Sequence, residues 1–264
     1  MTRLLVLAAA LIGLLTSPGQ TQNGPPPGNE AAAKLKPIVP PGQAAAVEAL
    51  PLDRLKLPSG FHIEVYAGGM PGARSLRVGS RGTVFVASPT AGKVYAIDST
   101  RAVRVVASGL HRPNGLAFRD GTLFIAEVSR ISKIDNIEDT LDHPAAPTVV
   151  YDELPKDEEN GLRFLGVGPD GKLYVSIGLP CNNCLPQATQ AQIRRIDLEG
   201  NNVEAVALGV RNSLGFDWSP ANKQLYFTDN GRDWLSEDAP SDESSIASPN
   251  RARISARPIA TRAI

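Results

Sequence analysis

The sequence has no excess of charge of either sign, because 27 lysines and arginines stand against 27 aspartates and glutamates. Nucleic-acid binding requires clustered basic charge, so this balance argues against DNA or RNA as a partner. Cysteine is also scarce, with two residues in the whole chain, Cys181 and Cys184. A zinc site built from four cysteines is therefore excluded.

The first residues have the layout of a secretory signal. Arg3 precedes the apolar run LLVLAAALIGLL, which small residues and Pro18 then interrupt. This run is too short to cross a bilayer as a stable helix. We expect residues 1–19 to be a signal peptide and the protein to be periplasmic or extracellular, with no stable membrane span. The alternative is an uncleaved anchor, since no A-x-A cleavage triplet is present.

Residues 20–51 are rich in Pro, Ala and Gly and show no apolar periodicity. Such a segment cannot bury enough surface to offset its chain entropy, so we interpret it as a flexible linker. Residues 52–243 then provide one domain of ordinary size. Because we expect export, Cys181 and Cys184 favour a small structural disulfide, with a redox pair as the alternative.

A turn followed by a short β-rich strand recurs along this domain. The four copies are GSRGTVFVAS (79–88), RDGTLFIAE (119–127), PDGKLYVSI (169–177) and PANKQLYFTD (220–229). A second strand follows the first three, as KVYAID, RISKID and QIRRID. A third element repeats with glycine at its first and seventh positions, as GLHRPNGLAF (109–118) and GVRNSLGFDW (209–218), with the weaker relative GMPGARSL (69–76).

Short strands that recur every 40 to 50 residues are typical of propeller blades, each a four-stranded sheet. The alternative is a β-sandwich with accidental similarity between its strands. The propeller is favoured because three distinct elements repeat in the same order. We therefore predict an all-β fold, a β-propeller of which about four blades are present.

Several strings together carry a family resemblance: LPSGFHIEVYAGGMPGARSL, ASGLHRPNGLAFRDGTLFIAEVSRI, GPDGKLYVSIGLPCNNC, GVRNSLGFDW and FTDNGRDWLSED. They resemble the sorbosone and aldose dehydrogenases, secreted six-bladed propellers similar to soluble glucose dehydrogenase. The resemblance covers residues 57–243. It implies pyrroloquinoline quinone (PQQ) and Ca²⁺ as cofactors and a small sugar as substrate, whereas the electron acceptor is not indicated.

The resemblance also implies roles for individual residues. Arg211 and Asn212 match a pair beside the quinone, where a guanidinium stabilises developing oxygen charge. Asn114 matches a polar position on the channel wall. A loop that approaches the cofactor is matched by Asn230, Gly231 and Arg232. An acidic pair near the calcium loop is matched by Asp242 and Glu243.

Each of these residues also has an ordinary structural interpretation. Asn114 and Asn212 could satisfy turn backbones. Arg211 could pair with a surface acid. The run SEDAPSDE, which contains Asp242 and Glu243, could be a solvated loop.

The sequence departs from the family at the position of the general base. Relatives carry His-His-Gly-Trp after Leu-Pro-Lys-Asp, whereas this chain has Glu159, Asn160, Gly161 and Leu162. Histidine titrates near the working pH and an amide does not titrate. Glu159 is the nearest carboxylate that could replace it. Catalysis by the family's usual base is therefore not expected, and a calcium-dependent lactonase-like propeller or a non-catalytic binding scaffold stand as alternatives.

Residues 244–264 depart from the pattern as well, with four arginines and no turn–strand alternation. Adding one C to a possible reverse translation gives LVNRVTQPGAHFGSPHCHAGD, which has the order of the family's continuation. We interpret this tail as aberrant, the product of a one-nucleotide frameshift, and expect the propeller to be truncated here. An open ring leaves blade faces bare, so we expect this chain to be inactive toward sugars.

Overall fold

The computed structural model describes residues 50–182, 184–231 and 244–248, and it is almost entirely β. Four antiparallel sheets follow one another along the chain. We call them blades 1 to 4. Blade 1 contains β1 (Ser75–Val78), β2 (Val84–Ser88), β3 (Lys93–Ile97) and β4 (Val103–Ala107). Blade 2 contains β5 (Gly115–Arg119), β6 (Thr122–Ala126), β7 (Ile131–Ile134) and β8 (Thr148–Tyr151).

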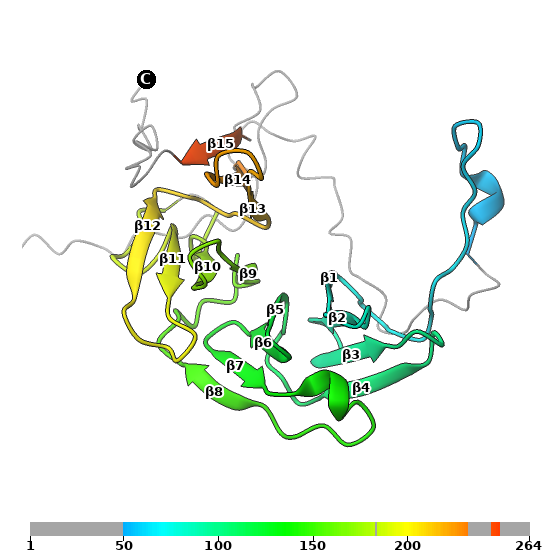
Figure 1. Cartoon of the computed structure of the whole chain (residues 1–264). Coiled ribbons are helices and arrows are strands. Elements are labelled where there is room, and N and C mark those ends of the chain that lie inside the picture. The colour runs from blue at the N-terminus through cyan, green and yellow to red at the C-terminus, as the bar shows by residue number, and fades with distance from the viewer. Residues whose placement is uncertain (1–49, 183, 232–243, 249–264) are drawn as a thin grey trace, which may run out of the picture.

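Blade 3 contains β9 (Leu165–Val167), β10 (Leu173–Ile177), β11 (Gln192–Ile196) and β12 (Glu204–Leu208). Blade 4 has three described strands, β13 (Phe216–Trp218), β14 (Leu225–Asp229) and β15 (Ser244–Ser248). Two short 3₁₀ turns are also present, η2 (Leu52–Arg54) and η3 (Ile137–Asp139). In every sheet the strands lie side by side in chain order. The described blades form an open arc with β1, β5, β9 and β13 on its inner side (Figure 1).

The repeats of the sequence occupy equivalent strands. The four turn-and-strand units form β2, β6, β10 and β14, and the second-strand motifs form β3, β7 and β11. In each unit, a residue near the start of the strand pairs with the last or next-to-last residue of the inner strand of its blade. These equivalent residues are Val84, Leu123, Leu173 and Leu225. The prediction of an incomplete propeller with about four blades is confirmed, and the β-sandwich alternative is wrong.

One strand was not foreseen from the sequence. β15 lies in the segment for which no strand was expected, and it pairs antiparallel with β14 from Leu225 to Asp229. Its sequence, SSIAS, has weak strand propensity. A neighbouring edge with unpaired backbone groups determines strand formation here, because pairing with β14 satisfies both chains.

Successive blades pack through alternate faces of each strand. Phe85 of β2 faces blade 2, and the equivalent aromatic residues Phe124 and Tyr174 face blades 3 and 4. Their exposed fractions are 0%, 3% and 7%, whereas Tyr226 at the same position of blade 4 is 44% exposed. The repeated aromatic residue therefore fills the junction to the following blade, and in blade 4 this face is open.

A polar side chain of β1 joins the inner strands of blades 1, 2 and 3. Arg77 donates from Nε to the carbonyl oxygen of Leu116 (3.1 Å) and from Nη2 to that of Leu165 (3.5 Å). These carbonyls belong to β5 and β9, whose inner edges have no further strand to pair with in the described structure. One guanidinium thus satisfies acceptors on two blades besides its own.

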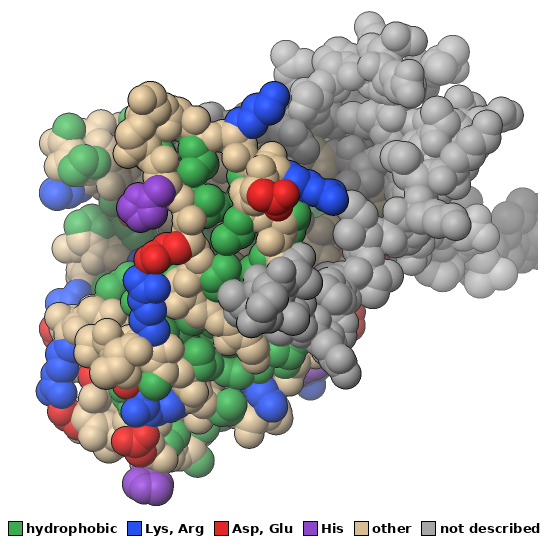
Figure 2. Space-filling view, turned by 90° about the vertical axis from the view of Figure 1, so that its right-hand side faces the viewer, with side chains coloured by type: hydrophobic (Ala, Val, Ile, Leu, Met, Phe, Trp, Pro, Cys, Tyr) green, Lys and Arg blue, Asp and Glu red, His purple; other side chains and the backbone are tan. Residues whose placement is uncertain are grey.

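The predicted signal peptide and most of the predicted linker lie outside the described residues. Within the described part, no helix has the length and apolar character needed to cross a membrane. Figure 2 shows the side of the molecule on which blade 1 lies. Solvent-exposed hydrophobic side chains lie among charged ones on this surface.

Candidate functional site

Two kinds of loop emerge at the same end of the blades, which we call the mouth. One kind joins the last strand of a blade to the inner strand of the next, and the other joins the second and third strands. The loop between β12 and β13 carries Arg211 and Asn212, and the loop between β10 and β11 carries Cys181 and Cys184. Antiparallel order within each sheet fixes this arrangement, so polar residues far apart in sequence meet at the mouth.

Arg211 is half-buried at the mouth and binds three oxygen atoms. Its Nε donates to the carbonyl oxygen of Asn182 (3.2 Å), and its Nη2 donates to the side-chain oxygen of the same residue (2.8 Å). Its Nη1 donates to the carbonyl oxygen of Asn230 (3.1 Å). The guanidinium is therefore fixed by two loops, and Asn182 is a site residue that the sequence reasoning missed.

Asn212 lies beside Arg211 and is 9% exposed. Its amide nitrogen donates to the side-chain oxygen of Asn160 (2.9 Å), and Asn160 donates to the carbonyl oxygen of Leu179 (3.1 Å). Asn230 donates its backbone N–H to the carbonyl oxygen of Asn212 (3.1 Å). The structure therefore brings together Asn160, Arg211, Asn212 and Asn230 from the predicted set.

A half-buried carboxylate holds the Arg211–Asn212 backbone. The side chain of Asp229 accepts the backbone N–H of Asn212 at 2.8 Å and that of Arg211 at 3.2 Å. Burial raises the pKa of Asp229 above its ordinary value of 3.8, although the N–H groups of Asn212 and Arg211 act in the opposite direction. Asp229 thus fixes the backbone of the Arg211–Asn212 pair at the mouth.

The same arrangement recurs in two other blades. Glu127 of blade 2 and Ser88 of blade 1 occupy the place of Asp229, four residues after the repeat positions Leu123 and Val84. Glu127 is fully buried and accepts the backbone N–H of His111 (2.6 Å), while the hydroxyl of Ser88 donates to the carbonyl oxygen of Pro71. A polar residue at the end of the second strand is therefore a repeated anchor for the mouth loop.

Asn114 is placed differently from the Arg211 cluster. It is 2% exposed, accepts a hydrogen bond from the Ser75 hydroxyl (3.1 Å) and donates to the carbonyl oxygen of Arg163 (2.9 Å). These contacts join the inner ends of blades 1, 2 and 3. The side-chain hydrogen bonds of Asn114 thus join neighbouring blades.

Glu159 is exposed at the mouth. Its neighbour Glu158 forms ion pairs with two residues of the loop between β4 and β5. Glu158 binds Arg112 (2.7 Å) and the Nε2 atom of His111 (2.7 Å). Arg112 and His111 hold the pKa of Glu158 below its ordinary value. His111 is therefore a histidine on the mouth with a carboxylate partner, although it does not occupy the position of the family's base.

Cys181 and Cys184 form a disulfide. The bond closes a short loop that contains Asn182, the main partner of Arg211. Gly231 is described next to Asn230, whereas Arg232, Asp242 and Glu243 lie outside the described residues. No group of three or more His, Cys, Asp and Glu side chains that could hold a metal ion occurs in the described part of the chain.

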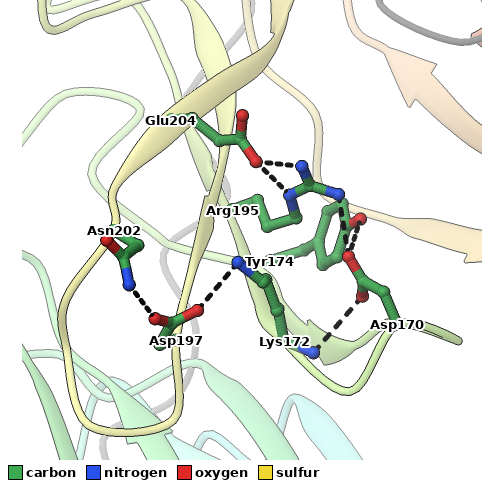
Figure 3. Close-up of polar contacts among 7 residues, drawn as sticks. All are labelled: Asp170, Lys172, Tyr174, Arg195, Asp197, Asn202 and Glu204. Atoms are coloured by element: carbon green, nitrogen blue, oxygen red, sulfur yellow. Dashed lines mark hydrogen bonds and ion pairs between the residues drawn. The ribbon is translucent and has the colours of Figure 1, made fainter.

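The opposite end of blade 3 carries a dense charged network of a different kind (Figure 3). Arg195 binds Glu204 and Asp170, and Lys172 binds Asp197 (2.9 Å). Desolvation would lower the pKa of Arg195, but its hydrogen bonds to Glu204, Tyr174 and Asp170 raise it. Every charge in this network has a partner on a neighbouring strand or turn, so we interpret it as a structural feature of the blade.

No protein-family model matches the sequence. An uncharacterized protein of Borreliella burgdorferi is 30% identical over 203 residues, which are 73% of this chain and 53% of that protein. The chain thus spans about half the length of the curated relative that it matches.

Solved structures share the fold. The holo PQQ domain of pyranose dehydrogenase from Coprinopsis cinerea superposes with a TM-score of 0.58 at 16% identity, covering 72% of this chain and 51% of that one. PQQ-bound aldose sugar dehydrogenase from Streptomyces coelicolor gives 0.57 at 18% identity, covering 81% and 67%. The calcium structure of a Trichoderma reesei carbohydrate-active enzyme of family AA12 gives 0.56 at 20% identity, covering 71% and 54%. This chain therefore has the propeller fold of these proteins.

Proposed function

We propose that this protein is a quinone-dependent sugar dehydrogenase of the sorbosone or aldose type, and that its mouth binds PQQ. The observation that carries the proposal is the Arg211 guanidinium, which Asn182 and Asn230 hold at the mouth. Two of the solved structures with the same fold contain PQQ. We further propose that the protein is exported and that its substrate is a small sugar.

The residues present fit the chemistry of this cofactor. PQQ is a planar anion that carries carboxylates and quinone oxygens, so it needs a cation and amide donors arranged around a flat face. Arg211 supplies a planar guanidinium, Asn182 supplies an amide that binds it, and Asn212 supplies a second amide from the next residue of the same loop. Asp229 keeps the pair in place through backbone hydrogen bonds. Gly231, without a Cβ atom, would permit a close approach of the backbone to the cofactor.

When bound, PQQ would supply the two-electron acceptor for the hydride from the anomeric carbon of the sugar. Arg211 would then stabilise negative charge on oxygen. The hydroxyl proton of the sugar needs an acceptor, but the amide of Asn160 does not titrate and is bound to Leu179 and Asn212. The described blades also leave the mouth open on one side (Figure 1). We therefore expect this chain to bind PQQ without oxidising sugars.

Calcium remains a proposal from the family resemblance. The acidic pair assigned to it, Asp242 and Glu243, lies outside the described residues. Carboxylate and carbonyl oxygens are the ligands that Ca²⁺ prefers, and the sequence after Asp229 contains several carboxylates. If Ca²⁺ takes part, binding of PQQ will weaken when a chelator is added.

The binding proposal is tested by titrating the purified chain with PQQ in the presence of Ca²⁺, following absorbance. Arg211→Ala removes charge-assisted hydrogen bonds and is expected to weaken binding roughly 10- to 100-fold. Arg119→Ala is the matched control, because Arg119 pairs with Asp120 in the turn between β5 and β6, at the end opposite the mouth. If the wild type, Arg211→Ala and Arg119→Ala bind PQQ with equal affinity, the role of Arg211 is refuted. If the wild type does not bind PQQ, the proposed cofactor is refuted.

The turnover proposal is tested separately, by reduction of an artificial dye with aldoses and added PQQ. We expect no reduction above a blank without protein. Sustained reduction would show that a proton acceptor other than the family's histidine is functional. Hydrolysis of lactones in the absence of PQQ would instead favour the lactonase-like alternative. Saturable PQQ binding with neither activity would favour the binding scaffold.

A further inference from the structure

The disulfide between Cys181 and Cys184 closes the tip of the loop that joins β10 to β11. Asn182 lies inside this closed tip, is 8% exposed, and accepts hydrogen bonds from Nε and Nη2 of Arg211. The Nη1 atom of the same guanidinium donates to the carbonyl oxygen of Asn230. The direction of the Arg211 side chain therefore depends on where the disulfide holds Asn182.

The backbone of Arg211 is held by groups outside the closed tip. The carboxylate of Asp229 accepts the N–H of Arg211 (3.2 Å), and the carbonyl oxygen of Arg211 accepts the N–H of Leu179 (2.8 Å). Both hydrogen bonds are independent of the two cysteines. Opening the disulfide should therefore leave the backbone of Arg211 in place and release its side chain.

The part of the same loop that leads into β11 is also fixed without the cysteines. The side chain of Gln192 donates to the carbonyl oxygen of Ala188 (2.9 Å), and the side chain of Gln190 donates to Asp157 (2.7 Å). Next to the tip, in contrast, Leu185 is 79% exposed, so apolar packing contributes little there. The disulfide is therefore the constraint that keeps Asn182 against Arg211.

The two sulfur atoms of the disulfide differ in access. Cys181 is 0% exposed, whereas Cys184 is partly exposed, so a thiolate reaches Cys184 first. Its attack forms a mixed disulfide with Cys184, and the sulfur of Cys181 leaves as a thiolate that takes up a proton. When the reagent is a dithiol, its second thiol group closes the reagent's own disulfide and releases Cys184 as a thiol. Two electrons thus pass from the dithiol to the protein.

We propose that the Cys181–Cys184 disulfide is a redox-controlled device that positions Arg211, and that its reduction by a dithiol lowers the affinity of the mouth for PQQ. The second half of this proposal rests on the proposed function. In the oxidised chain, Asn182 holds the guanidinium ready for a ligand. In the reduced chain, Arg211 occupies its binding position for part of the time, and the apparent Kd rises by the inverse of that fraction.

The effect of reduction should be local. A disulfide stabilises a whole domain more when it closes a longer loop, and these two cysteines are only three positions apart. We therefore expect a small change in Tm beside a clear change at Arg211. For an exported chain, full affinity for PQQ would follow oxidation in a compartment where disulfides persist.

The first test needs no cofactor. Heteronuclear NMR follows the Nε–H group of Arg211 before and after reduction with dithiothreitol, and Arg211→Lys assigns its signal. We expect exchange of this proton with water to become roughly tenfold faster on reduction. The matched control is the Nε–H group of Arg163, which donates to the carbonyl oxygen of Val128 (2.8 Å) from a side chain that is 1% exposed. Its exchange should not change.

Two results of this test would overturn the proposal. The first is equal protection of the Arg211 Nε–H group in the oxidised and reduced chains. The second is loss of protection at both Arg211 and Arg163, because reduction would then loosen the blades rather than release one side chain.

The second test compares the Kd for PQQ of the oxidised and reduced chains, after the dithiol has been removed under anaerobic conditions so that it does not react with the quinone. We expect reduction to raise Kd roughly three- to tenfold. The double variant Cys181→Ala/Cys184→Ala should match the reduced chain, with or without treatment by the dithiol. Equal affinity of the oxidised and reduced wild type would overturn the proposal. If the oxidised chain does not bind PQQ, the proposed function fails, and the NMR result alone decides whether the disulfide positions Arg211.

The coupling between the disulfide and Arg211 has its own test. If the disulfide acts through this side chain, reduction should not raise the Kd of Arg211→Ala any further, whereas Arg119→Ala should respond to reduction as the wild type does. A rise in Arg211→Ala equal to that in the wild type would show that the disulfide acts on another part of the mouth, which overturns the proposal.

Discussion

Gly115, at the seventh position of the repeated mouth motif, lies on the inner strand of blade 2 directly against blade 3. A Cβ atom placed on Gly115 would lie 2.7 Å from Cβ of Leu165, 2.8 Å from the backbone N of Leu165 and 2.8 Å from the carbonyl oxygen of Arg163. Two of these three atoms are backbone of blade 3, so a rotamer change cannot relieve the contact. Gly115→Ala must therefore push the two inner strands apart.

Overpacking of this kind typically costs about 1–3 kcal/mol. Alanine also restricts the unfolded chain, which offsets about 0.4–1 kcal/mol. We expect Gly115→Ala to lower the free energy of unfolding by about 1–2 kcal/mol and to lower Tm by several degrees, at roughly 2–4 °C per kcal/mol.

Gly215 provides the matched control, since it holds the same position of the motif in blade 4. A Cβ atom there would meet only Oγ1 of Thr228 at 3.9 Å, an ordinary contact. Gly215→Ala should therefore be neutral or slightly stabilising. Urea unfolding followed by circular dichroism compares the two variants. Equal stability of Gly115→Ala and Gly215→Ala would refute the packing of β5 against β9.

Two further predictions concern the anchors of the mouth loops. Because burial raises the pKa of Asp229, its contribution to stability is present at low pH, when it is protonated in both states, and is lost as the pH rises through the raised value. The wild type should therefore lose stability relative to Asp229→Asn as the pH rises above 3.8, and a constant difference in urea unfolding would contradict the raised pKa of this carboxyl. Glu127→Ala removes the fully buried acceptor of Arg130 and of the His111 N–H, and should cost about 2–4 kcal/mol of unfolding free energy. A loss below about 0.5 kcal/mol, as for an ordinary surface change, would show that Glu127 is not an anchor.

The blades could be predicted from the sequence because their determinants are local. Each unit, such as RDGTLFIAE, contains its own turn, its own β-rich strand residues and the aromatic residue that packs against the next blade. The strands could therefore be located by comparing the chain with itself. The strand β15 was missed because SSIAS carries no such pattern and forms through pairing with β14.

The site was less accessible to sequence reasoning, because its contacts join distant segments. Arg211 binds Asn182, 29 residues away, and Asn212 binds Asn160, 52 residues away. The family resemblance named Arg211 and Asn212 but gave no sign of Asn182. Asp229 did carry a signal, since it occupies the repeat position of Glu127, and alignment of the units would have found both anchors.

The central claim is that the mouth, and no other surface, receives the quinone. Hydrogen exchange of backbone amides, measured with and without PQQ, tests this claim most directly. We expect slower exchange on PQQ addition at residues 179–182, 209–214 and 229–231, with no change in the turns at residues 168–172 and 197–203 at the other end of blade 3. Protection confined to those turns, or none in the mouth segments at saturating PQQ, would contradict it.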